Sequence, residues 1–129
     1  MVEKGPVKHF SDLQAWQLAR QLRIELYKLV NDLPIEENYN LKNQIKRAAI
    51  SVTSNIAEGY GRFHYQENIQ FCRQSRGSLY EIQDHLITCL DQNYISQDRF
   101  NQLNDLILNT IKTLDGYIRY LNNQKNKRK

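Results

Sequence analysis

Apolar residues recur every three or four positions in four separate stretches of the chain, which is the spacing of one face of an α-helix. The stretches cover residues 11–33, 41–58, 65–92 and 96–121. The first ends before Pro34, because the residue that precedes a proline avoids the α region. No stretch alternates apolar and polar residues long enough to predict a strand. The pattern therefore predicts an all-α protein, an antiparallel up-down four-helix bundle.

Residues that commonly begin or end helices stand at several of these boundaries. Ser11 can cap the first helix, with Gln14 three positions later as in a capping box. Gly59 and Gly61 are expected to end the second helix by accepting left-handed backbone angles. Ser96 can cap the fourth helix. We therefore expect short connections between long helices.

Small residues in the middle of the third helix match small residues in the second. They are Ser75, Gly77 and Ser78 in the third helix and Ala48, Ala49 and Ser51 in the second. Glycine within a helix costs about 1 kcal/mol relative to alanine. We expect the small side chains to let the two helix backbones approach closely.

Length and composition fit one domain of ordinary size. The chain has 129 residues, of which 40% are hydrophobic and 25% charged, close to the average of soluble proteins. We expect a flexible leader over residues 1–9, the bundle over 10–121 and a basic tail over 122–129. The sequence has neither an apolar run long enough for a membrane span nor a secretory signal, which predicts a cytoplasmic protein with no membrane partner. Cys72 and Cys89 share no CxxC spacing and are expected to pack rather than react.

The net charge of +4 is unevenly distributed along the chain. Residues 122–129 contain four basic residues and no acidic ones, and residues 40–80 contain six basic residues and two acidic ones. A basic middle and a basic tail favour an anionic partner that is reached by one face, such as nucleic acid. The predicted nucleic-acid contacts are Lys42, Lys46, Arg47, Arg62, Arg73, Arg76, Lys125, Lys127, Arg128 and Lys129, with Tyr80 for stacking. A solvated helix face and a merely solubilising tail are the alternatives.

The first helix carries a second candidate surface beside its apolar face. Trp16, Arg20, Arg23 and Tyr27 fall on one stripe at helical spacing. Guanidinium groups over aromatic rings contribute about 0.5–1 kcal/mol at exposed positions, so the stripe can be intramolecular packing. It can also offer a surface for stacked bases and phosphates. The sequence leaves both interpretations open.

The sequence contains no pattern of residues that is typical of a catalytic or cofactor-binding site. A di-iron bundle needs Glu-x-x-His on two helices, whereas Glu81 and His85 are four positions apart and have no second copy. His85 and Cys89 share a face, but zinc requires four ligands and two are missing. The sequence therefore predicts a protein without cofactors that is not an enzyme.

The second predicted helix resembles the signature of the bacterial 23S rRNA intervening-sequence protein family. The matching run is Leu41-x-x-Gln44-Ile45-Lys46-Arg47-Ala48-Ala49-x-Ser51-x-x-x-Asn55-Ile56-Ala57-Glu58-Gly59-x-Gly61-Arg62. Two shorter runs are also similar to the family, Phe10-x-Asp12-Leu13-x-Ala15-Trp16 and Gly77-Ser78-Leu79-x-Glu81. The resemblance covers about residues 10–121.

This resemblance implies a cytoplasmic four-helix bundle that assembles as a ring-like homopentamer. It also implies kinship with the accessory variability determinants of diversity-generating retroelements, which bind nucleic acid and assist a reverse transcriptase in cDNA synthesis. We therefore expect a non-catalytic, oligomeric RNA-binding accessory protein. The alternatives are a scaffold that docks onto a polymerase without touching nucleic acid, and a ligand-binding bundle.

Overall fold

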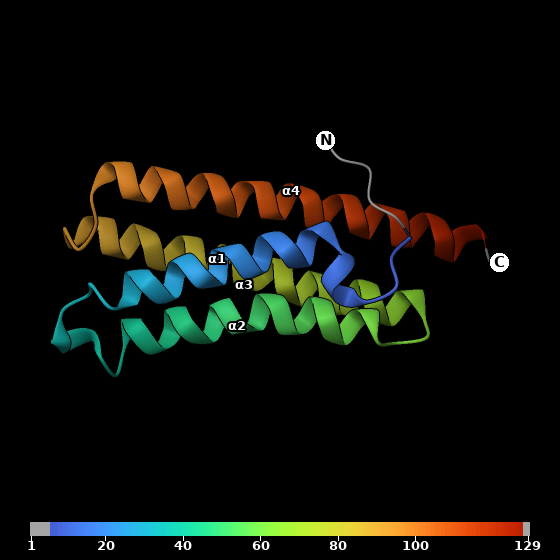
Figure 1. Ribbon diagram of the computed structural model, residues 1–129, viewed down its shortest axis with the longest axis horizontal. Coiled ribbons are helices and arrows are strands. Elements are labelled where there is room, and N and C mark those ends of the chain that lie inside the picture. Colours follow the sequence, from blue (N-terminus) through green and yellow to red (C-terminus); the bar gives the residue numbers. More distant parts are fainter. Residues whose placement is uncertain (1–5, 128–129) are drawn as a thin grey trace.

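The computed structural model describes residues 6–127, and four long helices make up most of this part of the chain (Figure 1). They are α1 (Gln14–Val30), α2 (Leu41–Tyr60), α3 (Tyr65–Asp91) and α4 (Gln97–Lys127). The short 3-10 turns η1 (Phe10–Asp12) and η2 (Ile35–Glu37) precede α1 and α2, and no strand occurs within the described range. Successive helices run in opposite directions, which confirms the predicted antiparallel four-helix bundle (Figure 1).

Each helix packs against two neighbours. α1 and α3 both contact α2 and α4, so α1 lies diagonally across the bundle from α3, and α2 from α4. The α1–α2 side and the α3–α4 side are therefore opposite outer surfaces of the molecule. The α1–α2 connection and the α3–α4 turn lie at one end, whereas the α2–α3 loop lies at the other, near the last turns of α4 (Figure 1).

The predicted apolar stripes meet along the axis of the bundle. Leu26, Ile45, Leu79 and Ile107, one from each helix, have no exposed surface. Full burial of such a side chain stabilises the fold by about 1.5–3 kcal/mol. The stripes thus form one continuous core along the length of the bundle.

The close approach of α2 and α3 depends on two serines of α3. Ser75 Oγ, which is fully buried, donates a hydrogen bond to the Val52 carbonyl at 2.8 Å. Ser78 Oγ and Ser51 Oγ lie 2.8 Å apart in a second hydrogen bond. Gly77 has no part in the contact, because a Cβ at this position would meet nothing within 4 Å. The expected close approach is confirmed for the serines and is wrong for Gly77.

The helix start at Ser11 differs from the prediction. Ser11 lies inside η1, where the His9 side chain accepts from the Ser11 backbone N–H and the Asp12 carboxylate accepts from the His9 backbone N–H. The 3-10 turn occupies the residues that were expected to cap the helix. As a result α1 begins at Gln14 with no side-chain cap. The predicted cap at Ser96 is confirmed, since its Oγ accepts from the Arg99 N–H at 3.1 Å.

The expected left-handed glycines at the end of α2 are also wrong, because no glycine of the described chain has a positive φ. Gly59 is a buried helical residue. A Cβ on it would lie 2.7 Å from Asn68 Oδ1 and 2.9 Å from Phe71 Cβ of α3. Gly59 therefore permits a close helix contact, and its conformation is ordinary.

The basic tail is helical as far as the structure describes it. α4 continues to Lys127 without interruption, and Lys125 Nζ donates to Gln66 Oε1 of α3 at 2.8 Å. Residues 122–127 thus extend the bundle, where the sequence had indicated a separate flexible arm. The predicted contacts Arg128 and Lys129 lie outside the described residues, as do residues 1–5 of the expected leader.

Candidate nucleic-acid interface

The aromatic and basic stripe of α1 faces α2. Arg23 Nη1 donates to Thr53 Oγ1 of α2 at 2.9 Å. The Lys46 Nζ of α2 lies 5.6 Å from the centroid of the Tyr27 ring, and the Arg20 guanidinium lies 6.0 Å from that of Trp16. The structure thus joins two groups that the sequence had listed separately, the stripe of α1 and part of the basic segment of α2.

These residues form one outer surface, here called the α1–α2 face. It consists of Trp16, Arg20, Arg23, Ile24, Tyr27 and Lys28 of α1 with Lys46 and Ile50 of α2. A shallow pocket of about 440 Å³ lies between the helices, with Arg23, Ile24 and Ile50 among its lining residues. Ile24 and Ile50 are exposed, so this surface combines cations with accessible apolar groups. Sequence analysis missed both isoleucines, although each stands outside the apolar stripe of its helix.

Of the carboxylates of α1 and α2, one contacts a cation of the α1–α2 face: Glu25 Oε2 lies 3.3 Å from Lys28 Nζ. Glu25, the single acid of α1, turns toward α4 and accepts a hydrogen bond from Arg99 at 3.1 Å. That hydrogen bond is the main cause of a pKa for Glu25 below its ordinary value of 4.5. Glu58, the single acid of α2, is ion-paired with Arg62 near the end of the helix at 3.1 Å. Arg20, Arg23 and Lys46 have no ion pair within the described range, so these three cations of the face retain an unneutralised positive charge.

Two more predicted contacts lie near this face on α2. Lys42 is one helical turn before Lys46, and Arg47 follows Lys46 on the exposed side of the helix. Neither cation has an ion pair or hydrogen bond with any residue of the described range. Both can therefore add to the positive potential near the α1–α2 face.

The remaining predicted cations are elsewhere. Arg76 of α3 pairs with Asp115 of α4 at 2.7 Å, on the opposite side of the bundle from the α1–α2 face. Arg62 lies beyond the end of α2, between Glu58 and Glu67, with its guanidinium 4.9 Å from the Phe71 ring centroid. Arg73 and Tyr80 are exposed on α3.

The expectation that the six cations of residues 40–80 share one face is therefore wrong. The segment folds into two antiparallel helices, and a helix distributes its side chains over all directions at 3.6 residues per turn. Two of the six cations, Arg62 and Arg76, are neutralised by carboxylates. Of the cations predicted in this segment, Lys46 of α2 is the one that lies beside the aromatic and basic stripe of α1.

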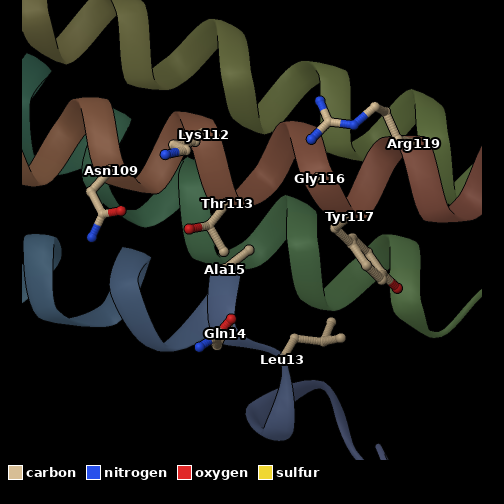
Figure 2. Close-up of a pocket in the computed structure, with 9 residues that line it drawn as sticks. All are labelled: Leu13, Gln14, Ala15, Asn109, Lys112, Thr113, Gly116, Tyr117 and Arg119. Carbon is tan, nitrogen blue, oxygen red and sulfur yellow. The ribbon is translucent and has the colours of Figure 1, made fainter. Parts of the chain in front are cut away.

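The α1–α4 side carries a different surface. A pocket of about 440 Å³ lies between the start of α1 and the second half of α4, and Figure 2 shows Gln14, Asn109 and Thr113 around it. Arg119 lies over Gly116, where a Cβ would be 3.6 Å from its guanidinium. Leu13, Ala15, Lys112 and Arg119 also line this pocket, so it combines apolar, polar and basic groups.

The two cysteines are buried in the core with free thiols. Burial raises the pKa of Cys72 to about 12 and that of Cys89 to about 11, so both remain protonated and unreactive near neutral pH. His85 lies 3.2 Å from Glu81 on the same helix. Among residues 6–127, no cluster of three or more His, Cys, Asp or Glu residues could hold a metal ion. No helix in this range is long and apolar enough to cross a membrane.

The fold and the candidate interface define an all-α bundle with a basic, aromatic outer face. The family model of the 23S rRNA-intervening sequence protein matches residues 11–116, so the chain belongs to this family. The structure is similar to the crystal structure of a protein of unknown function from the S23 ribosomal protein family of Bacteroides thetaiotaomicron. The two share 17% identity and a TM-score of 0.75 over 81% of this chain and 97% of the other. No curated protein matches the chain.

Proposed function

We propose that this protein is a non-catalytic, cytoplasmic RNA-binding accessory protein that acts as a homo-oligomer. The α1–α2 face is the nucleic-acid surface in this proposal. Its cations contact phosphates, and Trp16 and Tyr27 offer rings for stacking. Contacts of this kind read little sequence and depend strongly on salt, because binding releases the counterions of the phosphates.

The observation that carries the proposal is that Arg20, Arg23 and Lys46 of the α1–α2 face pair with no carboxylate of the described residues. Glu25 pairs with Lys28 and with Arg99 of α4, and Glu58 pairs with Arg62, so the acids of α1 and α2 leave these three cations unpaired. A surface held together by mutual ion pairs would present alternating charges. Here the cations are supported by aromatic rings and by the Thr53 hydroxyl, so their charge remains available to an anion.

Self-association would use the opposite side of the bundle. Tyr80 and Ile87 of α3 and Leu108 of α4 are exposed on these two helices. Burial of such side chains between copies would stabilise a ring, as the family resemblance implies, and would leave the α1–α2 face open. Repetition of one weak face around a ring raises the overall affinity for a long polyanion. The proposed protein partner is a reverse transcriptase, because the family resemblance implies kinship with retroelement accessory proteins.

Filter binding of single-stranded RNA at low salt tests the proposal. The variant Arg20→Glu/Lys46→Glu should bind at least tenfold more weakly than the wild type, and the salt dependence of its affinity should be shallower. The matched control is Arg73→Glu/Lys112→Glu, which makes the same charge change at exposed cations of α3 and α4. It should lose about threefold or less, since distant exposed charges are screened.

Equal losses in the two variants would overturn the assignment of the α1–α2 face. A wild-type protein without measurable RNA affinity would overturn RNA binding itself and would favour the polymerase scaffold. Thermal unfolding of each variant checks that the bundle is intact, and all the substituted side chains are partly or fully exposed.

A further inference from the structure

We infer that an aromatic pocket at the end of the bundle binds an unstacked base of single-stranded nucleic acid, an inference that rests on the proposed function. The pocket has a volume of about 580 Å³, within the range of small-ligand sites. It lies around the α2–α3 loop, beside the last turns of α4. Its aromatic lining comes from Tyr60, Phe63, Tyr65, Tyr117 and Tyr120.

One wall of the pocket is held by two hydrogen bonds, one partly buried and one buried. Asn68 Nδ2 donates to the Tyr117 hydroxyl at 3.0 Å, and the Cys72 thiol donates to Asn68 Oδ1 at 3.5 Å. Gly59 is packed directly against Asn68, so the amide has no room to move away. The Tyr117 ring is thereby held in place before any ligand arrives, which lowers the entropic cost of binding.

Two exposed rings of the pocket, those of Tyr120 and Phe63, are placed for stacking. Tyr120 stacks on Tyr117 with the ring centroids 6.2 Å apart and the planes inclined by 14°, yet 53% of Tyr120 is exposed. Phe63, in the loop, is 95% exposed and gains nothing from the core. Stacking of a base on an aromatic side chain contributes about 1–3 kcal/mol per base and tolerates any base identity. An exposed phenylalanine beside a fixed pair of tyrosines fits this use.

One unpaired cation beside the pocket favours a nucleotide over an uncharged aromatic ligand. Arg62 lines the pocket, but its charge is offset by Glu58 and Glu67. Lys125 lies one helical turn beyond the lining residue Leu121, and its Nζ is held by the neutral Gln66 side chain. Lys125 pairs with no carboxylate of the described residues and can contact the phosphate next to a docked base. Duplex nucleic acid cannot present a base in this way, because its bases are already stacked and paired.

The pocket also lies at one end of the α1–α2 pair of helices. Leu13, directly before α1, and Tyr60, the last residue of α2, both contribute to its lining. Trp16, on the α1–α2 face, is one helical turn from Leu13. A strand whose phosphates follow the α1–α2 face can thus place a base in the pocket at the end of its path.

The test compares the affinities of the full-length protein for three probes of equal length: an oligouridylate, an RNA duplex and an abasic phosphodiester strand. The wild type should bind the oligouridylate more tightly than the abasic strand. The variant Phe63→Ala/Tyr120→Ala should bind the oligouridylate roughly fivefold or more weakly, and the abasic strand and the duplex as before. The control is Tyr39→Ala, which removes a ring that is 94% exposed at the opposite end of the bundle and should change nothing.

Equal binding of oligouridylate and abasic strand by the wild type would overturn the inference and leave the proposed function standing. The same holds for a double variant that binds oligouridylate as the wild type does. A wild type that binds none of the three probes would overturn both. Phe63→Trp provides a second check, because a larger ring at this position should preserve or strengthen the preference for the oligouridylate.

Discussion

The side of α2 that faces α3 differs in its side chains from the side that faces α1. Toward α3, the helix presents small side chains at close range, with the Ser51–Ser78 hydrogen bond and Gly59 against Asn68. Toward α1, it presents Lys46 and the exposed Ile50, and the rings and guanidinium groups of α1 lie beside them. One side is a tight, neutral contact, whereas the other is an open, positively charged surface.

The difference shows which residues of the family-like run serve the fold and which are free to serve a partner. Small residues such as Ser51 and Gly59 are required by the distance between α2 and α3. Lys46 belongs to the same run of sequence, yet its contact is a partly exposed tyrosine ring. A resemblance carried by the first kind of residue supports the fold, and only the second kind bears on function.

The largest expected effect concerns the tight side. Gly59→Ala would place a Cβ 2.7 Å from Asn68 Oδ1 and 2.9 Å from Phe71 Cβ, so α2 and α3 must move apart. We expect the free energy of unfolding to fall by about 1–2 kcal/mol, because overpacking outweighs the gain in helix propensity. Urea denaturation measures the change.

Gly77→Ala is the matched control for this prediction. A Cβ at Gly77 meets nothing within 4 Å, so only helix propensity changes, and the free energy of unfolding should rise by about 1 kcal/mol. If both glycine variants were stabilised by the same amount, the close packing between α2 and α3 would make no contribution to the free energy of unfolding.

A substitution on the α1-facing side of α2 should change the affinity for RNA and leave the free energy of unfolding unchanged. Ile50→Glu introduces a carboxylate into the pocket that Arg23 and Lys28 line, at a side chain that is 47% exposed. Repulsion of about 1 kcal/mol from a nearby phosphate would weaken RNA binding about fivefold. Ile50→Gln keeps the polarity and size without the charge and should bind RNA as the wild type does. If the two variants lost affinity equally, the charge of this face would be irrelevant to binding.

The smallest effect concerns the ion pair between Glu25 of α1 and Arg99 of α4. Glu25→Gln should lower the free energy of unfolding by about 0.5 kcal/mol at neutral pH, since the pair with Arg99 is partly exposed. The Arg99 hydrogen bond lowers the folded-state pKa of Glu25 below 4.5, so the stabilisation is fully present above pH 4.5. It is lost as the pH falls through the lowered pKa. Chemical denaturation of both proteins across acidic pH should show their stabilities converge, and a constant difference would contradict the prediction.

Sequence reasoning succeeded where the evidence is local or periodic. The stripes that contain Ile45 and Ile107 predicted buried faces, and both residues are completely buried. The cap at Ser96 was recognised because capping depends on neighbours three positions away. The same reasoning failed at Ser11, where a 3-10 turn competes for the same residues, and at Gly59, whose role depends on a distant helix.

The candidate interface was only partly accessible from the sequence. Trp16, Arg20, Arg23 and Tyr27 could be placed on one stripe by helical spacing alone. Their neighbour Lys46 was assigned to another group, because α1 and α2 are joined by a turn and a sequence window does not cross it. Asp115, which neutralises Arg76, lies 39 positions away and could not be anticipated.

The amino-acid sequence by itself determined that there are four helices and which of their faces are buried, because hydrophobic burial acts on a periodicity written in consecutive residues. Only the tertiary structure decided which charges remain free. That outcome depends on which helices become neighbours and on how Glu25, Glu58 and Asp115 find their arginines. Coulomb interactions act through space over a few ångströms, and distance along the chain does not measure that separation.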